Sequence, residues 1–533
     1  MEREALAERR TRRKMDRREF LRRSATIVAA PAFIVGDAAR PAVPCGVAAG
    51  DVTSGPLRAG ASAGQGRAIV WSRTDRPARL IVEYSTTTSF SGARRVVGPA
   101  ALEDTDFTAR VDLADLPDGQ RISYRVTFQD LSDLRTFSEP VDGTFLMPPR
   151  AGERDVTFAF SGDCVGQGWG IDLARGGLRL YEAMRRVEPD VFIHLGDTIY
   201  ADQPLQSEVA LEDGSVWRNV VTEAKSRVAQ ELDDYRGCHR YNLQDEHMRR
   251  FNASAPLVAL WDDHEVRDNW YPAQRLDRDE RYREKSVALL AARAKRAFLE
   301  YQPVRIHPIE TERIYRSWRY GAALEIFALD MRSYRGSNSP NRQTQLDDDS
   351  ALLGAAQVDW LQRALAASRA TWKVIAADLP IGVVVPDGPN DFEAVANRDD
   401  GAPLGRELEI ARVLTFIRDR RIRNVVWITA DVHYGAAHHY SPTRARFTGF
   451  DPFWEFVAGP MHAGTFGPNP LDATFGPEVR FLGIPPGMKP NRPPSEPFQF
   501  FGLGRIDRRT RVLTMKLRNV NGEIFSIDLS PHR

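Results

Sequence analysis

Between residues 42 and 149, short runs of apolar and β-branched residues follow one another at even intervals, with turn residues between them. The clearest runs are 68–72, 79–84, 107–113 and 122–128. Evenly spaced short strands without helical periodicity are typical of an all-β sandwich of the fibronectin or immunoglobulin type. The stretch Met147-Pro-Pro-Arg-Ala-Gly has the composition of a linker. We therefore predict an N-terminal β-sandwich domain over residues 42–149.

The remaining chain, residues 150–533, alternates short apolar runs with stretches of helical periodicity. Leu178, Tyr181 and Met184, for example, fall on one helical face. Alternation of strand and helix predicts an α/β domain whose strands are buried. Residues 459–497 are rich in proline and glycine and are expected to form long loops within this domain.

Several apolar runs of the second domain end in the same way, at an aspartate. The acids in question are Asp163, Asp197, Asp262, Asp263, Asp330, Asp378 and Asp431, with His264 and His433 close behind two of them. If the runs are strands of one sheet, the acids gather at its carboxyl edge, where open α/β sheets bind their ligands. Crowded, unpaired carboxylates are costly, and a hard di- or trivalent cation is the usual solution. For any single aspartate, capping of a turn or helix is an equally good interpretation.

The first residues of the chain indicate where the protein acts. Residues 1–24 hold ten Lys/Arg against five Asp/Glu, and Arg17-Arg18-Glu19-Phe20-Leu21 precedes a short apolar run from Ala25 to Val35. A paired arginine, a weak apolar region and small residues predict a twin-arginine signal peptide over residues 1–41, with an amphipathic helix as the alternative. The twin-arginine export machinery is then a partner, and the mature protein is expected in the periplasm or secreted. No run is long enough to predict stable membrane insertion.

Overall charge and cysteine content exclude two further classes. Outside residues 1–24 the chain has 63 Lys/Arg against 67 Asp/Glu, so binding to nucleic acid through bulk positive charge is not expected. Three cysteines, Cys45, Cys164 and Cys238, make no disulfide framework.

The offsets around the acids form recognisable motifs. Gly196-Asp-Thr-Ile-Tyr200, Trp261-Asp-Asp-His-Glu265 and Ala430-Asp-Val-His433 occur in this order along the chain. Together they resemble the blocks of calcineurin-like metallophosphoesterases. The Asp-Asp-His-Glu and Ala-Asp-Val-His variants, the export signal and Leu329-Asp-Met-Arg-Ser-Tyr-Arg335 resemble one branch, the alkaline phosphatase D (PhoD) family. The resemblance implies an α/β (α+β sandwich) metallophosphoesterase domain behind the all-β sandwich.

The resemblance also implies a ferric ion, Fe3+, and one or two calcium ions, Ca2+, with ligands carried over by position. Asp197 matches the bridging carboxylate, Tyr200 the iron-bound phenolate and His433 the iron-bound imidazole. Asp263 and Asp431 match the second metal site, where carboxylates in place of imidazole are consistent with calcium. In the first block both Asp163 and Cys164 are candidate ligands. The loop after them favours Asp163, and the alternative for Cys164 is a small buried filler.

The remaining candidates concern the reacting phosphate. His264 matches a residue that donates a hydrogen bond or proton near the leaving oxygen, with Glu265 expected to orient it. Arg332 and Arg335 either clamp phosphate or brace their loop by pairing with acids. The implied reaction is hydrolysis of a phosphate ester by a metal-activated water, without a covalent phospho-enzyme.

Two alternatives stay open. One is a phosphodiesterase or phospholipase D-like enzyme of the same fold, acting on phospholipids or teichoic-acid-like polymers. The other, from a different class, is a binding protein on an inactive phosphoesterase fold. The acid and histidine set favours an enzyme.

Overall fold

The computed structural model describes residues 66–150 and 152–532 and, in addition, the backbone of strand β1. The predicted export signal, residues 1–41, lies outside the described residues. The strands are β1 Val43–Ala48, β2 Gly66–Arg73, β3 Ala78–Ser85, β4 Arg94–Ala101, β5 Thr108–Leu116, β6 Arg121–Asp130, β7 Val141–Leu146, β8 Val156–Ser161, β9 Val191–Leu195, β10 Glu208–Ala210, β11 Val216–Arg218, β12 Leu257–Leu260, β13 Arg316–Tyr320, β14 Leu324–Ala328, β15 Trp372–Ala376, β16 Pro386–Asp387, β17 Asp391–Phe392, β18 Val425–Thr429, β19 Ala436–Tyr440, β20 Phe453–Val457, β21 Pro477–Leu482, β22 Phe501–Ile506, β23 Leu513–Asn519 and β24 Gly522–Leu529. The helices are α2 Arg179–Arg185, α3 Leu232–Asn242, α4 Glu246–Asn252, α5 Val287–Tyr301, α6 Ala355–Ala367 and α7 Glu407–Asp419, with short 3-10 turns at Glu103–Thr105, Leu173–Arg175 and Glu223–Lys225.

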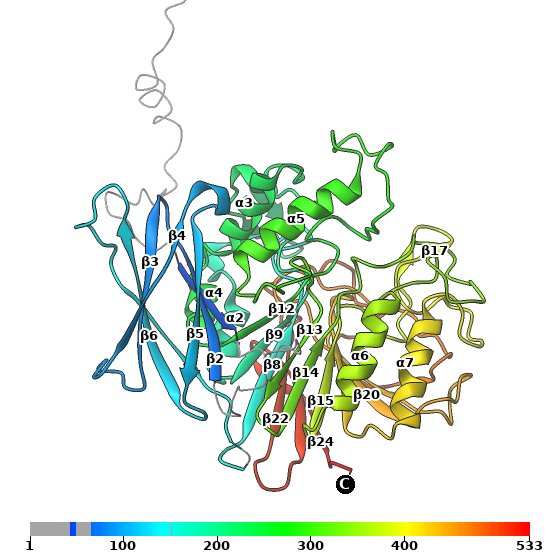
Figure 1. Ribbon diagram of the computed structural model, residues 1–533. Coiled ribbons are helices and arrows are strands. Elements are labelled where there is room, and N and C mark those ends of the chain that lie inside the picture. The colour runs from blue at the N-terminus through cyan, green and yellow to red at the C-terminus, as the bar shows by residue number, and fades with distance from the viewer. Residues whose placement is uncertain (1–42, 49–65, 151, 533) are drawn as a thin grey trace, which may run out of the picture. The chain divides into compact units, whose positions relative to one another are not determined.

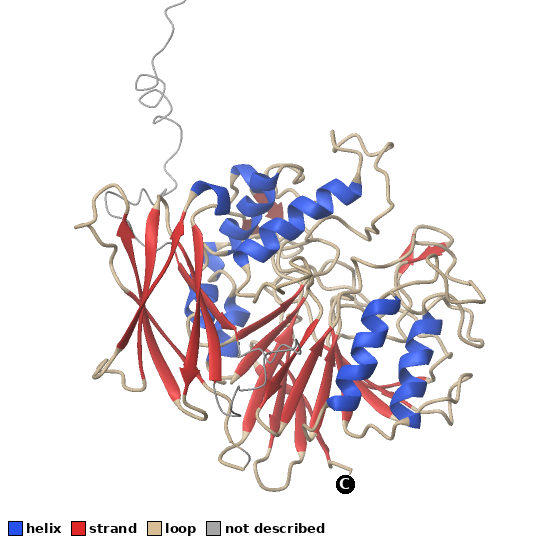
Figure 2. Cartoon of the chain, in the orientation of Figure 1, coloured by secondary structure: helices blue, strands red, loops and turns tan. Residues whose placement is uncertain are grey.

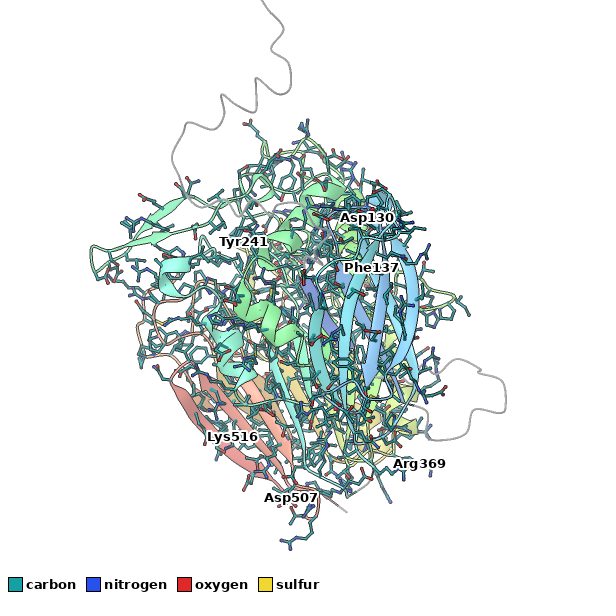
Figure 3. All side chains as sticks on the ribbon, turned by 90° about the vertical axis from the view of Figure 1, so that its left-hand side faces the viewer. Asp130, Phe137, Tyr241, Arg369, Asp507 and Lys516 are labelled. Carbon is teal, nitrogen blue, oxygen red and sulfur yellow. The ribbon has the colours of Figure 1, made fainter. Side chains whose placement is uncertain are left out.

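The N-terminal strands form two antiparallel sheets, with strand orders β1-β2-β5 and β4-β3-β6-β7. Alternate residues of both sheets, among them Val70, Leu80, Val111 and Val126, join one buried hydrophobic cluster. This is the period-two pattern expected when one face of each strand is buried. Figure 3 shows this part of the chain from the side, with Asp130 at the end of β6 and Phe137 beside it.

The rest of the chain is built on two mixed sheets. The first has six strands in the order β12-β9-β8-β22-β23-β24, and the second has seven in the order β13-β14-β15-β18-β20-β19-β21. Within them, β12, β9 and β8 run parallel to one another, as do β14, β15, β18 and β20. A single cluster that includes Phe160, Ile193, Ile326 and Ile428 takes residues from both sheets, so the sheets pack face to face.

Helices cover the outer faces of this pair of sheets. Helices α6 and α7 lie side by side on the seven-stranded sheet, where Leu361 and Leu414 pack with Phe327 and Trp427 (Figure 1). Helices α2 and α4 cover the six-stranded sheet through Met184 and its neighbours. Figure 2 shows the resulting order of helix, sheet, sheet and helix. Residues 459–497 contain strand β21 and otherwise loops and turns.

The strands that end in aspartate belong to two sheets, whereas the sequence argument considered one. Strands β8, β9 and β12 lie in the six-stranded sheet, and β14, β15 and β18 lie in the seven-stranded sheet. An apolar run buried on both faces looks the same in either sheet, so the sequence pattern does not assign it to one. The parallel strands of both sheets nevertheless bring their carboxyl ends together at one edge, where the acids meet.

The N-terminal strands are hydrogen-bonded to the part that follows them. Trp71 Nε1 donates to the carbonyl of Glu300 at 2.6 Å, and the Tyr124 hydroxyl donates to the carbonyl of Ala253 at 3.1 Å. The buried Asp106 accepts from Arg73 at 2.9 Å and also from Arg240 and Tyr301. Within the part of the chain that the structure describes, no helix is both long and apolar enough to cross a membrane.

Candidate metal centre

A repeated local structure positions the acids. Strands β8, β9 and β18 are each followed by one small residue, Gly162, Gly196 or Ala430, and then by Asp163, Asp197 or Asp431. The three aspartates have left-handed backbones with φ of 64°, 51° and 63°, and His433 has φ of 60°. Left-handed non-glycine residues are uncommon and store strain, and they cluster at functional sites.

The small residues let the strand ends approach one another. A Cβ on Gly196 would lie 2.4 Å from the Cβ of Asp262, and a Cβ on Gly162 would lie 2.7 Å from the Cβ of Ala430. Both separations are far below a normal contact between carbon atoms, which is 3.5–4.0 Å as a rough guide. Gly196 therefore allows the ends of β9 and β12 to meet within one sheet, and Gly162 allows the end of β8 to meet that of β18 in the other sheet.

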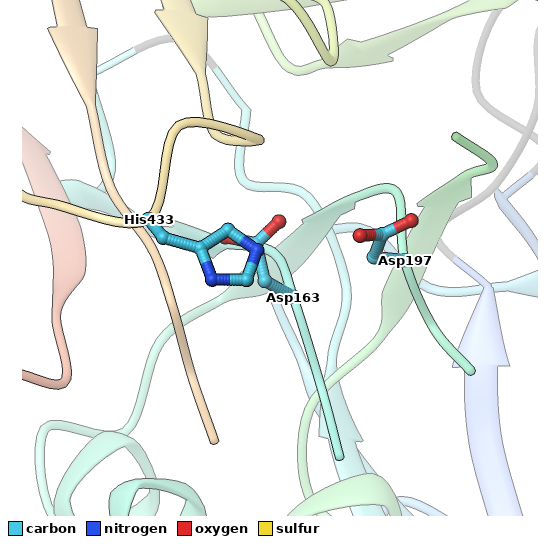
Figure 4. Close-up of side chains that lie close together, drawn as sticks. All are labelled: Asp163, Asp197 and His433. Atoms are coloured by element: carbon cyan, nitrogen blue, oxygen red, sulfur yellow. The ribbon is translucent and has the colours of Figure 1, made fainter. Parts of the chain in front are cut away.

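Three overlapping groups of side chains result, and the possible ligand atoms within each group lie within 4.8 Å of one another. The groups are Asp163, Asp197 and His433; Asp197, Asp263 and His264; and Asp262, Asp263 and Asp431. Figure 4 shows the first group, in which the ring of His433 lies over Asp163 while Asp197 comes from a neighbouring loop. Asp197 is shared by the first two groups and Asp263 by the last two, so the sites are contiguous.

These carboxylates are buried and incompletely paired. Asp163 Oδ2 and Asp263 Oδ1 are buried without a hydrogen-bond partner. Burial, reinforced by neighbouring carboxylates, raises the pKa of Asp163, Asp197 and Asp431 well above the usual value for aspartate. Buried carboxylates with free lone pairs, beside one imidazole, are the donor set that a hard cation satisfies. The residues present therefore fit a centre of di- or trivalent metal ions.

Tyr200 and His433 face each other at the first group. The Tyr200 oxygen lies 2.8 Å from His433 Nε2. On the other side of the ring, Nδ1–H donates a hydrogen bond to the carbonyl of Gly464 at 2.5 Å. That contact leaves Nε2 as the accepting nitrogen, and in this structure it accepts from the Tyr200 hydroxyl. The buried Lys225 donates to the carbonyl of Tyr200 at 2.6 Å and holds this loop in place.

The structure brings Asp163, and not Cys164, into the group. Cys164 is buried in a hydrophobic cluster with Tyr181 and Met461, and the Tyr181 hydroxyl lies 3.8 Å from its sulfur. Burial raises the pKa of the Cys164 thiol to about 12. Only a thiolate binds metal, so this environment favours an inert, buried side chain.

His264 lies beside both Asp197 and Tyr200. Its backbone N–H donates to Asp197 Oδ1 at 3.1 Å, and its ring stacks on Tyr200 with 4.2 Å between centroids. Ring atom Nδ1 lies 2.8 Å from Asp202 Oδ1. Burial opposes a charged imidazole, but Asp202 and Asp263 outweigh it and raise the pKa of His264 above its usual value.

Glu265 has a different role from the one expected. The carboxylates near the His264 ring are those of Asp202, hydrogen-bonded to Nδ1, and Asp268, 3.7 Å from Nε2. Glu265 instead accepts from the backbone N–H groups of Asp197, Thr198 and Asp262, at 3.1, 2.5 and 2.7 Å. It thereby ties the ends of β9 and β12 together.

Both arginines of the Asp-Met-Arg-Ser-Tyr-Arg segment are buried. Arg332 contacts several carboxylates, at 2.5 Å from Asp262 and 2.9 Å from Glu393, which is the bracing arrangement. Arg335 donates through one nitrogen, Nη2, to Asn338 and to the carbonyl of Glu393. Its Nε and Nη1 atoms are buried without a hydrogen-bond partner.

Sequence reasoning missed or left unassigned four residues of this centre. Asp202 follows Tyr200 by two residues, and this short offset is a signal that could have identified it. The sequence identifies Asp262 and Asp378 as acids that follow apolar runs but assigns neither a ligand nor a catalytic role. Glu393 lies in a loop without periodicity, where the sequence carries no signal. Asp330, by contrast, accepts from Trp261 Nε1 at 2.9 Å and from the backbone of Arg332 and Ser333, so it stabilises a turn.

The sequence profile described as PhoD-like phosphatase matches residues 158–517, which include every residue of the three groups. The chain belongs to the PhoD-like phosphatase family. A second profile, described as the N-terminal domain of PhoD-like phosphatases, matches residues 28–141. The resemblance inferred from the motifs is thus confirmed.

Individual relatives agree with this family. Alkaline phosphatase D of Bacillus subtilis (strain 168) is 31% identical over 306 residues, which are 55% of this chain and 48% of that protein. The match therefore spans about half the length of this curated relative. A solved structure of PhoD is 21% identical, covers 94% of this chain and 90% of its own, and has a TM-score of 0.65.

A more distant structure shares the fold. Purple acid phosphatase PPD1 from yellow lupin (Lupinus luteus) seeds is 11% identical, covers 92% of this chain and 74% of its own, and has a TM-score of 0.54. At 21% and 11% identity, these two structures show only that the fold is shared. That fold is a pair of mixed sheets with helices on the outer faces.

Proposed function

We propose that this protein is an exported, metal-dependent phosphoesterase that hydrolyses phosphate esters. The observation that carries the proposal is the set of buried, incompletely paired carboxylates around Asp197 and Asp263, inside the region matched by the PhoD-like phosphatase profile. Burying unpaired carboxylates costs free energy, and bound cations would offset that cost. Membership in the PhoD-like phosphatase family indicates that the reaction is hydrolysis of a phosphate ester.

The proposed ligands combine residues of the three groups with the positions that the family resemblance implies, which add Tyr200 and pair Asp431 with Asp263. Asp163, Asp197, Tyr200 and His433 hold the first ion, and Asp263, Asp431 and the shared Asp197 hold the second. We assign ferric iron to the first, because phenolate and imidazole are among its donors, and calcium to the second, because its donors are all carboxylates. Bound cations of this kind stabilise charge on phosphate oxygens and lower the pKa of water. We leave Cys164 out of the ligand set because of its apolar surroundings.

His264 is proposed to donate a hydrogen bond or proton to the leaving oxygen. Its Nδ1 is held by Asp202. Nε2 lies 3.7 Å from Asp268 Oδ1, beyond hydrogen-bond distance, and is the atom available to a substrate. The stacked ring of Tyr200 restricts the imidazole to one plane. A catalytic donor fixed in this way loses little conformational freedom when the substrate binds.

Arg335 is the better candidate of the two arginines for binding phosphate. Its Nε and Nη1 have no hydrogen-bond partner, whereas the donors of Arg332 face carboxylates. A guanidinium with two free N–H groups suits the bidentate recognition of phosphate. We therefore assign substrate contact to Arg335 and a bracing role to Arg332.

The domain organisation is proposed on the same basis. Residues 1–41 would form the twin-arginine signal, residues 42–149 a β-sandwich of fibronectin or immunoglobulin type, and residues 150–533 the catalytic domain. The two antiparallel sheets with a common core support the sandwich. Export places the active protein in the periplasm or outside the cell.

The bridging role of Asp197 gives the sharpest test of this proposal. Asp197→Asn removes one charge from both proposed sites, and we expect about a 100-fold or greater loss of phosphatase activity together with loss of bound metal. Asp330→Asn is the matched control, because Asp330 also follows a strand but accepts hydrogen bonds from its own turn and from Trp261, and an amide oxygen can still accept both. The control should keep its metal and activity. An Asp197→Asn protein with wild-type turnover and metal content would show that the site is assigned wrongly.

Substrate class is tested by comparing a chromogenic phosphate monoester with the matching diester at equal concentration. Faster hydrolysis of the monoester supports a phosphomonoesterase. A preference of more than about tenfold for the diester, equivalent to 1.4 kcal/mol in the barrier, would identify a phosphodiesterase instead.

A further inference from the structure

Arg332 is fully buried at the back of the candidate metal centre, with 0% of its side chain exposed. It follows strand β14 and contacts acids from three other segments. Nε lies 2.5 Å from Asp262 Oδ1 and 3.3 Å from Asp378 Oδ2. Nη1 and Nη2 donate to the two carboxylate oxygens of Glu393, at 2.9 and 3.3 Å. One guanidinium thus ties the ends of β12, β14 and β15 to the loop that carries Glu393.

The same guanidinium approaches the proposed metal ligands without hydrogen-bonding to them. Nη2 lies 4.0 Å from Asp263 Oδ1 and 3.7 Å from Asp431 Oδ1. Both distances exceed that of a hydrogen bond, so the charge of Arg332 acts on these carboxylates while their lone pairs stay available.

Asp262, Asp263 and Asp431 form the third of the candidate metal-binding groups, and Arg332 contacts all three. We propose that Arg332 is the resident cation of this third group, a positioning residue that takes the place of a further metal ion and keeps Asp263 and Asp431 oriented toward the ion of the second site. The inference deepens the proposed function and rests on it for the assignment of Asp263 and Asp431 as metal ligands.

Arginine suits this position for physical reasons. Its charge is permanent, it is less strongly hydrated than an ammonium group, and its planar fork matches the two oxygens of Glu393. Removing one member of such a buried ionic cluster leaves uncompensated charge, which is strongly destabilising. The acids behind the centre would then take up a cation from solution.

The test is a double-mutant cycle on thermal unfolding, using Arg332→Met, Glu393→Gln and the double variant, each measured in chelator and in excess calcium. In chelator we expect Arg332→Met to lower Tm by about 5 °C or more. The fall should be clearly smaller in the Glu393→Gln background, because one of the unpaired charges has gone. Excess calcium should raise the Tm of Arg332→Met more than that of wild type, because the freed carboxylates bind it.

Arg406→Met is the matched control. Arg406 is equally buried, but its hydrogen bonds go to backbone carbonyls and to Asn338. The decrease in Tm of Arg406→Met relative to wild type should be the same in chelator and in excess calcium. If Arg332→Met behaves like this control, and loses the same Tm in both Glu393 backgrounds, the guanidinium contributes packing only and the proposal is overturned.

Two further comparisons complete the test. If Arg332→Met does not fold, Arg332→Lys replaces it in the cycle. Lysine keeps the charge, so Arg332→Lys should lower Tm by less than half as much as Arg332→Ala does. Equal decreases in Tm for the two variants would refute a role for the charge. The cycle in chelator needs neither turnover nor bound metal. A wild-type protein that binds no metal would therefore disprove the proposed function, while the cycle would still decide the role of Arg332.

Discussion

At the scale of single residues, the centre depends on which of two neighbours faces the acids. Asp163 and Cys164 are adjacent, and the sequence offers both as candidate ligands, with the following loop favouring Asp163. The left-handed backbone at Asp163 turns its carboxylate into the group while Cys164 enters the apolar cluster. Backbone conformation of this kind is set by tertiary contacts, such as the donation from the N–H of Cys164 to the carbonyl of Asp197 at 2.9 Å. A motif carries no direct signal for it.

Buried histidines make stability depend on pH. His194, on β9, lines a cavity of about 30 Å³ with Thr198 and His239, and burial lowers its pKa to about 3. Because the folded-state pKa lies below the unfolded value near 6.5, the unfolded state binds more protons as pH falls from 6.5 toward 3, and stability is lost over that range. Between pH 7 and 5 we expect His194 alone to cost about 2 kcal/mol of unfolding free energy.

The measurement is the denaturation midpoint at several pH values for wild type and His194→Gln. The variant should lose less stability than wild type on acidification. His532→Gln, which alters an exposed histidine, is the control and should follow wild type. Parallel pH profiles for wild type and His194→Gln would contradict the burial argument.

At the scale of elements, the repeated unit is a parallel strand, a small residue and an aspartate. The acids at the strand ends and the GDxxY-type spacing could be predicted from the sequence, because each depends on local order along the chain. The division of the strands between two sheets could not, since buried parallel strands are apolar on both faces. The roles of Asp202 and Glu393 also depend on long-range packing. Their partners, His264 and Arg332, lie 62 and 61 residues away in the sequence.

Gly196 is the position where this unit tolerates least change. It has φ of 109°, and an added Cβ would lie 2.4 Å from Asp262. Gly196→Ala should displace the end of β9 from that of β12, lower Tm, and reduce metal content and activity together. Gly214→Ala is the matched control, because Gly214 also has positive φ, 80°, but open space around its Cβ position. The measurements are Tm by calorimetry and metal content by elemental analysis for both variants. Equal losses in the two variants would show that the positive φ, and not the close approach to Asp262, makes Gly196 necessary.

At the scale of the whole molecule, a buried ionic cluster joins the N-terminal strands to helices α3 and α5. Asp106 accepts from Arg73, Arg240 and Tyr301. Burial opposes the charge of Asp106, but Arg73, Tyr301 and Arg240 outweigh it and lower the pKa. Asp106→Ala leaves two arginines without this partner and should cost about 3–5 kcal/mol of stability.

Asp112→Ala is the comparison for that variant. Asp112 pairs with Arg67 and Arg305, bridges the same two parts of the chain, and is 32% exposed. An exposed pair contributes about 0–1 kcal/mol. Thermal unfolding should therefore separate the two variants clearly, with metal content unchanged in both. Equal and small effects would indicate that the Asp106 cluster does not hold the N-terminal strands in place.

We propose that the buried acids around Asp197 form a metal centre that hydrolyses phosphate esters. The most direct test is elemental analysis of the purified protein, combined with hydrolysis of a chromogenic phosphate before and after chelation. We predict bound iron and calcium, loss of activity on chelation, and its return when calcium is restored. Protein that contains no metal and still hydrolyses the substrate at the same rate would contradict the account.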